Sequence, residues 1–190
     1  MGIFWWVPTH LRRFHHSGQA HFITFSCYQR APLLAGLEIR QTFEVALERV
    51  RRHYQARIFG YVVMPEHVHL LLSEPEVKTL AVVLQSLKQG VSRRYIGERK
   101  HFWQKRYYDF NVRNEQQLIE KLRYIHRNPV KRGLCIQPED WKSSSFLHYA
   151  TGTRGTVEIE SEWTARLRER EPARLRPAAL PTNVASENLY

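Results

Sequence analysis

The segment Met64-Pro65-Glu66-His67-Val68-His69-Leu70-Leu71-Leu72 decides how the rest of the chain is read. Because an extended chain alternates its side chains between two faces, His67 and His69 share one face of a strand. The apolar side chains of Val68, Leu70 and Leu72 point into a core on the other face. Two neutral imidazoles on adjacent outward positions can bind one divalent ion and leave room for a third ligand and a substrate. The alternative is a half-buried strand edge, since His-x-His also arises by chance.

The composition is that of a folded and strongly basic protein. The chain has 190 residues, of which 43% are hydrophobic, and its 29 Lys and Arg exceed 18 Asp and Glu to give a net charge of +11. This length suits one domain with extensions, and the charge indicates a polyanionic partner, either nucleic acid or an anionic membrane surface. No apolar run approaches a membrane span, and the N-terminus lacks the apolar core of a signal peptide. We therefore expect a nucleic-acid-binding protein of the cytoplasm.

Hydrophobic periodicity predicts the order strand, helix, strand, strand, helix, strand. The strands are expected at 21–28, 57–63, 67–73 and 101–111, and the helices at 38–54 and, after the capping residue Thr79, at 80–95. This order is typical of an antiparallel sheet with both helices on one face and the other face free for a site. The predicted fold class is therefore α+β and ferredoxin-like (RRM-like).

A third helix is predicted at 115–127, after the capping residue Asn114. It is expected to end before Pro129, because the residue that precedes a proline avoids helical dihedrals. At about 100° per residue, Tyr124 and Asn128 lie one turn apart and away from the apolar stripe of the helix. That stripe consists of Leu118, Leu122 and Ile125. Tyr124 is thus not needed for the core and can serve a site.

Together, these residues suggest a metal-assisted reaction at a phosphate. A divalent ion held by His67, His69 and the side-chain oxygen of Asn128 would have room for oxygens of a scissile phosphate. Tyr124 is then a sensible nucleophile, activated by the field of the ion or by a nearby base. Its attack would link DNA to the protein through a phosphodiester, which can be passed to a second strand without ATP.

Three ordered motifs give the chain a resemblance to a known family. They are HVH at 67–69 within MPEHVHLLL, FWQ at 102–104 before a Tyr-Tyr pair, and YIHRNPV at 124–130 followed by Gly133-Leu134. On these motifs, over roughly residues 18–148, the chain resembles the REP-associated tyrosine transposases (RAYT), within the HUH single-tyrosine transposase superfamily.

The resemblance implies a metal-dependent endonuclease and strand transferase for single-stranded DNA. It implies that His67 and His69 bind catalytic Mg²⁺ or Mn²⁺ with Asn128 as third ligand, and that Tyr124 forms a covalent 5′-phosphotyrosine intermediate. The implied substrate is hairpin DNA from repetitive extragenic palindromes, which is cut and rejoined. The protein would work as a monomer or homodimer in the bacterial cytoplasm, at the nucleoid.

Several other side chains have more than one interpretation. Glu66 is either a hydrogen-bond partner of a metal ligand, a proton acceptor, or a solvated turn residue. Tyr107 and Tyr108 are alternative nucleophiles, but they lie on a predicted strand without an Asn one turn away and are interpreted as packing or stacking residues. His126 points away from Tyr124 by helical geometry. Four basic residues are candidate DNA contacts that would act collectively: Arg93, Arg94, Lys105 and Arg106. For Arg93 and Arg94 the alternative is a solvated helix face.

The expected organisation is an N-terminal arm at 1–17, a HUH single-tyrosine transposase-like catalytic domain at 18–150 and a basic C-terminal tail at 151–185. The tail contains one possible helix near 160–171. Residues 186–190 resemble the start of a protease-cleavage tag and take no part in the functional argument.

Two alternative functions fit parts of the sequence. One is a module that binds hairpin DNA or RNA without cutting it, since ferredoxin-like sheets host such binders. Such a binder gains little from two outward imidazoles beside a tyrosine that lies off the apolar stripe. The other is a HUH endonuclease of rolling-circle replication or conjugative nicking, whose motifs often follow a different order.

Overall fold

The computed structural model describes residues 20–170 of the chain, and side chains up to Glu169. The predicted N-terminal arm, the last part of the predicted tail and the predicted tag remnant lie outside the described residues.

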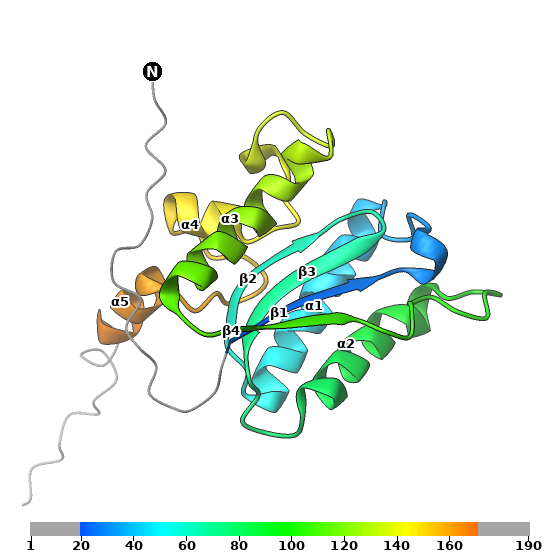
Figure 1. Ribbon diagram of the computed structural model, residues 1–190, viewed down its shortest axis with the longest axis horizontal. Helices are drawn as coiled ribbons and strands as arrows, with labels where there is room; N and C mark the ends of the chain where they lie inside the picture. The colour runs from blue at the N-terminus through cyan, green and yellow to red at the C-terminus, as the bar shows by residue number, and fades with distance from the viewer. Residues whose placement is uncertain (1–19, 171–190) are drawn as a thin grey trace, which may run out of the picture.

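A four-stranded antiparallel sheet forms the centre of the described chain (Figure 1). Its strands lie in the order β2-β3-β1-β4, with β1 at Ala20–Ser26, β2 at Ile58–Val63, β3 at His67–Ser73 and β4 at Tyr108–Val112. A short 3-10 helix, η1 (Tyr28–Arg30), follows β1. Helix α1 (Leu37–Tyr54) joins β1 to β2, and α2 (Leu80–Tyr95) joins β3 to β4. The predicted α+β, ferredoxin-like fold is confirmed.

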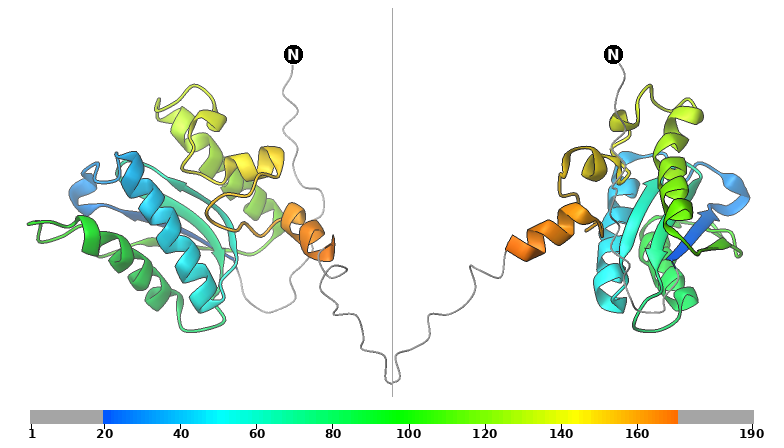
Figure 2. Two further views of the ribbon diagram at one scale, coloured as in Figure 1. Left: turned by 180° about the vertical axis from the view of Figure 1, so that it is seen from behind. Right: turned by 60° about the vertical axis from the view of Figure 1, so that its left-hand side comes forward.

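Helices α1 and α2 cover one face of the sheet, as the view from behind in Figure 2 shows. The side chains of Val68, Leu70 and Leu72 point to this face, where Phe43 of α1 and Leu87 of α2 are fully buried against them. Alternation along β3 therefore sends its two histidines to the opposite face, as the sequence predicts.

Helix α3 (Glu115–Lys131) covers that opposite face, although the sequence pattern predicts a free face there. Its predicted stripe is confirmed: Leu118, Leu122 and Ile125 are buried against β1, β2 and β3. The sheet also presents apolar side chains on this face, including Phe22 and Leu71. These side chains are buried only when a helix packs against them. The histidine pair consequently lies beneath a helix rather than on an open surface.

The end of α3 also differs from the prediction. The helix continues through Pro129 to Lys131. Asn128 and Pro129 are both buried, and the backbone N–H groups of Arg132 and Leu134 donate to the carbonyls of Asn128 and Pro129. A proline in the last turns removes a single helical hydrogen bond, and packing together with these terminal bonds holds the segment helical.

Strand β4 is shorter than the predicted strand at 101–111. The backbone N–H of Gln104 donates to the Ser26 carbonyl, whereas Tyr108 pairs with Thr24. The segment at 104–108 therefore contains two more residues than the part of β1 that it faces, so it loops out of the sheet. The pattern of alternating aromatic and basic residues does not reveal this insertion.

The chain after α3 closes the outer edge of β2. It contains η2 (Pro138–Asp140), α4 (Phe146–Thr151) and α5 (Glu162–Arg170). Three backbone hydrogen bonds join it to β2: Val63 N–H to the Ser143 carbonyl, Ser145 N–H to the Tyr61 carbonyl, and Glu160 N–H to the Ile58 carbonyl.

The predicted tail contributes to the core. Val157 and Ile159 are 2% exposed, and Ile159 forms a parallel bridge with Ile58. Helix α5 lies where the tail was expected to contain one helix. The boundary at residue 150 stays a prediction, although residues 157–161 lie against the domain rather than apart from it. Across residues 20–170, every helix is too short or too polar to span a bilayer.

Candidate active site

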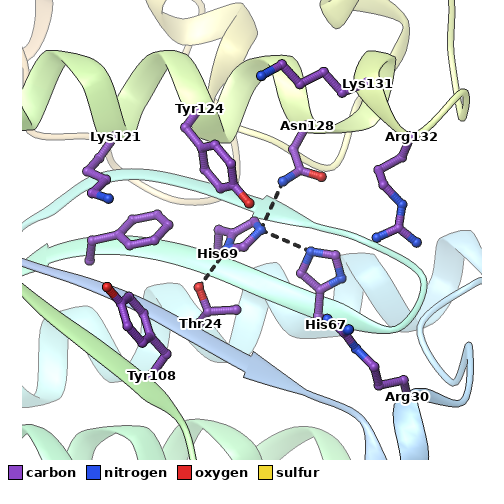
Figure 3. A pocket seen from close by; sticks show the side chains of 11 residues that line it. Thr24, Arg30, His67, His69, Tyr108, Lys121, Tyr124, Asn128, Lys131 and Arg132 are labelled. Atoms are coloured by element: carbon purple, nitrogen blue, oxygen red, sulfur yellow. Dashed lines mark hydrogen bonds between the residues drawn. The ribbon is translucent and has the colours of Figure 1, made fainter.

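Two buried histidines on β3 aim their ring nitrogens at a common point under α3 (Figure 3). His67 and His69 are 3% and 4% exposed, and their Nε2 atoms lie 3.0 Å apart. The Nδ1 atom of His69 lies 2.7 Å from Thr24 Oγ1, and that of His67 lies 3.1 Å from Glu66 Oε1. The carboxylate accepts only, so it keeps the His67 proton on Nδ1, and the Thr24 hydroxyl allows the same tautomer in His69. Both Nε2 lone pairs are then available to one cation.

Burial keeps these imidazoles neutral. It lowers the pKa of His67 below its usual value, against the opposing charge of Glu66. Burial lowers the pKa of His69 further, to about 3, and the neighbouring His67 acts in the same direction. A neutral ring is the form that binds a metal ion, so the pair needs no deprotonation at neutral pH.

Glu66 connects the histidine pair to the end of α3. Its Oε1 atom lies 2.7 Å from Arg132 Nη2 as well as near His67. Burial raises the pKa of Glu66, but its interactions with His67 and with the Arg132 guanidinium outweigh this effect and hold the pKa below its usual value. Of the interpretations that the sequence left open for Glu66, the structure supports the hydrogen-bond partner of a candidate ligand.

Helix α3 brings Asn128 and Tyr124 to the same point (Figure 3). Asn128 is 6% exposed, and its Nδ2 atom lies 3.0 Å from His69 Nε2. Rotation of the amide by 180° places its oxygen there instead, as a metal ligand requires. Tyr124 is 42% exposed, and its ring centroid lies 5.1 Å from that of His69. The predicted pairing of Tyr124 and Asn128 thus puts an accessible hydroxyl beside a buried amide.

The donor set fits a divalent ion. Two cis ligands at about 2.1 Å from an octahedral ion are about 3.0 Å apart, which matches the observed 3.0 Å between the two Nε2 atoms. The third donor would be the amide oxygen of Asn128. The site thus combines two histidines with an amide, and the described residues contain no group of three His, Cys, Asp or Glu that could hold a metal ion.

The site opens into a cavity of about 490 Å³ whose charge is positive. Among the described residues, its lining contains no carboxylate. Four cations line it: Arg30, Lys121, Lys131 and Arg132. A second cavity of about 630 Å³ adjoins the first, because Thr24 and Tyr108 line both. Such walls suit a polyanion.

The other predicted residues lie in different places. Lys105 and Arg106 line the second cavity, together with Tyr107 and the 54% exposed Tyr108. Arg93 and Arg94 lie on α2, on the other side of the sheet, and Arg94 pairs with Glu38 at 3.3 Å. The structure therefore does not bring these two arginines to the site. His126 points away from Tyr124 as predicted, to within 2.9 Å of Ser145 Oγ.

Sequence reasoning missed six residues that line the site: Phe22, Thr24, Arg30, Lys121, Lys131 and Arg132. Thr24 had a detectable signal, since alternation along β1 separates it from the core residues Ile23 and Phe25. Lys121 lies one turn before Tyr124 on the predicted helix, so helical spacing could have found it. Arg132 had no such signal, because the prediction ended α3 too early.

A comparison with known protein families matches residues 15–128, well over half of the chain, to the family described as "Transposase IS200 like". The chain belongs to this family. Its resemblance to the REP-associated tyrosine transposases is also confirmed.

Two relatives and one solved structure illustrate this resemblance. A putative REP-associated tyrosine transposase of Haemophilus influenzae is 30% identical over 117 residues, which cover 55% of this chain and 66% of the relative. The REP-associated tyrosine transposase of Escherichia coli is 29% identical over 136 residues, 71% of this chain and 81% of the relative. The structure of a REP-associated tyrosine transposase bound to a REP hairpin aligns with a TM-score of 0.63 and 27% identity, over 80% of this chain and 92% of the other.

Proposed function

We propose that this transposase cuts and rejoins single-stranded hairpin DNA of the REP type through a covalent 5′-phosphotyrosine at Tyr124. His67, His69 and Asn128 hold a divalent ion, Mg²⁺ or Mn²⁺, beside it. The observation that carries the proposal is the meeting of Tyr124 and Asn128, from α3, with two Nε2 atoms 3.0 Å apart on β3. The relative solved with a REP hairpin supports the choice of substrate.

The cavity residues bind and orient the strand. Arg30, Lys131 and Arg132 offer charge-assisted hydrogen bonds to phosphate oxygens, which place the scissile phosphate before Tyr124. Of these, Arg132 is shared with Glu66, so its position is fixed before the strand arrives. The ion, when bound, polarises the scissile phosphate and offsets the negative charge that develops on it.

The reaction exchanges one phosphodiester for another. The Tyr124 oxygen forms a bond to phosphorus as its proton leaves to solvent, which reaches this 42% exposed side chain. The bond from phosphorus to the 3′ oxygen of the preceding nucleotide breaks and releases a 3′ hydroxyl. Attack by another 3′ hydroxyl reverses the step and rejoins DNA without ATP.

The test is a denaturing gel of protein incubated with labelled single-stranded hairpins from the DNA that flanks its gene. We expect a shifted covalent band with Mg²⁺ or Mn²⁺, and none with EDTA or with Tyr124→Phe. Tyr124→Phe removes one oxygen and leaves the cationic walls in place, so its DNA affinity in a gel shift should stay near wild type. Tyr108→Phe is the matched control, since it removes the other tyrosine hydroxyl of the cavity and should keep the band.

Two outcomes would contradict the proposal. A covalent band that persists in Tyr124→Phe would assign the nucleophile elsewhere. Binding of hairpins without a covalent band under any divalent ion, and unchanged by His67→Ala, would favour a module that binds hairpins without cutting them.

A further inference from the structure

Lys121 occupies an unusual position in the cavity, one helical turn before Tyr124. Its ammonium lies 4.8 Å from the ring centroid of Phe22 and 4.5 Å from that of Phe110. These two aromatic residues are direct cross-strand partners on β1 and β4. The ammonium is therefore held over an aromatic pair by cation–π attraction, which orients a side chain that is otherwise long and flexible.

The charge of Lys121 has no acidic partner within residues 20–170. Its ammonium lies over the two rings, whereas Arg132, another cation of the cavity, pairs with Glu66. A half-buried ammonium over two rings can still donate hydrogen bonds on the side that faces the cavity. The pocket thus keeps one oriented cation available for an anionic ligand.

The position of Lys121 separates it from the candidate metal site. In Figure 3 its ammonium points to the side of Tyr124 away from Asn128 and His67, and Tyr108 stands on the opposite wall. Tyr108 lies on the same face of β4 as Phe110, two residues away. It also lines the second cavity, together with Lys105 and Arg106. A continuous path of cations and aromatic rings therefore leads from Tyr124 past Lys121 to the edge of β4, as a single strand requires.

We propose that Lys121 binds a phosphate of the substrate strand that neighbours the scissile phosphate, on the β4 side of Tyr124. By holding that phosphate over the Phe22–Phe110 pair, Lys121 sets which phosphate reaches the Tyr124 hydroxyl. The inference rests on the proposed function of the site, but it concerns binding and can be tested without cleavage.

The experiment measures hairpin affinity in proteins that carry Tyr124→Phe, so that no strand is cut. A neutral methylphosphonate replaces each phosphate in turn within three nucleotides of the cleavage point. With Lys121 present, we expect one position beside the scissile phosphate to lose about tenfold in affinity, the size of one charge-assisted contact. With Lys121→Met, which keeps the apolar stem over the rings, unmodified DNA should bind about tenfold more weakly and that same position should lose nothing more.

Three further variants test the origin of the effect. Lys121→Arg retains a cation over the rings and should restore the sensitivity at that position. Arg123→Met removes a positive charge from an exposed position of the same helix and should leave the position-dependent pattern unchanged. Lys121→Gln repeats the test if the Met variant is unstable in a thermal melt.

The proposal would be overturned if the Met variant kept the full sensitivity at that position, or if no position near the cleavage point depended on residue 121. These outcomes differ from failure of the proposed function. That failure would appear as the absence of a covalent band with the unsubstituted protein and unmodified DNA, a measurement in which Lys121 is intact.

Discussion

Gly60 controls how closely α3 approaches the sheet. A Cβ atom added at this position of β2 would lie 2.5 Å from Leu122 Cδ2, 3.3 Å from Ser145 Oγ and 3.9 Å from Ile125 Cδ1. Leu122 and Ile125 belong to the buried stripe of the helix that carries Tyr124 and Asn128. Gly60→Ala should therefore push α3 away from β3 and separate the two halves of the site.

The expected magnitude follows from these contacts. Overpacking a core costs about 1–3 kcal/mol, and the lower part of this range applies because the nearest atom is the end of a leucine side chain. Replacement of glycine by alanine also stabilises the protein by about 0.4–1 kcal/mol, because it lowers the conformational entropy of the unfolded chain. A net loss of about 1 kcal/mol lowers the Tm by about 2–4 °C in a protein of this size. The rate of covalent adduct formation should fall at least tenfold, because a displacement of about 1 Å can cost a hundredfold in rate.

The assay pairs a thermal melt with the initial rate of adduct formation. Gly155→Ala is the matched control, since an added Cβ there meets no atom within 4 Å. Leu122→Val in the Gly60→Ala background should recover part of the rate by making room for the new methyl group. If Gly60→Ala matches Gly155→Ala in both Tm and rate, the close approach of α3 does not hold the site together.

Three other predictions concern polar contacts. Thr24→Val removes the partner of His69 Nδ1 and should weaken Mn²⁺ affinity about 10- to 100-fold in a calorimetric titration; unchanged affinity would show that this hydrogen bond does not orient the ring. Tyr61→Phe removes the hydroxyl that donates to the buried Glu44 carboxylate at 3.0 Å and should cost about 1–3 kcal/mol in urea unfolding, whereas a smaller loss would indicate another donor. Burial lowers the pKa of His126 to about 3. In the unfolded chain His126 has its usual pKa of about 6.5 and takes up a proton below that pH, whereas the folded state excludes this proton. The free energy of unfolding therefore falls as the pH drops below about 6.5. This dependence amounts to about 1–2 kcal/mol at pH 5, and His126→Gln should reduce the slope of unfolding free energy against pH.

Periodicity predicted the parts of the fold that local sequence determines. The bounds of β3 at 67–73 and of α2 at 80–95 agree with the structure, because each has an uninterrupted apolar pattern and a clear start. The caps at Thr79 and Asn114 also agree, since each side chain accepts a hydrogen bond from a backbone N–H three residues later. The separation of Tyr124 from the apolar stripe followed from helix geometry alone.

Contacts between distant segments could not be predicted in the same way. The loop before β4 depends on how many residues face β1, which a single strand pattern does not contain. The continuation of α3 through Pro129 depends on burial of the proline, which overrides the local preference for a helix end. The site was predicted as an exposed pair of ligands. The hydrogen bond between His69 and Thr24 depends on the pairing of β3 with β1, and the burial of the site and its link to Arg132 arise only when α3 docks.

The closed edge of β2 bears on the solubility of the protein. An edge strand presents unpaired N–H and C=O groups that can template pairing with another chain. Here the backbone of residues 143–145 and 159–160 occupies that edge, and the side chains of Trp141 and Tyr149 donate to the carbonyls of Val63 and Phe59. A chain truncated after α3 would retain both histidines and Tyr124 but would expose the edge of β2, a buried and largely apolar strand. We expect such a chain to self-associate through this edge. The segment after α3 therefore protects the protein from aggregation.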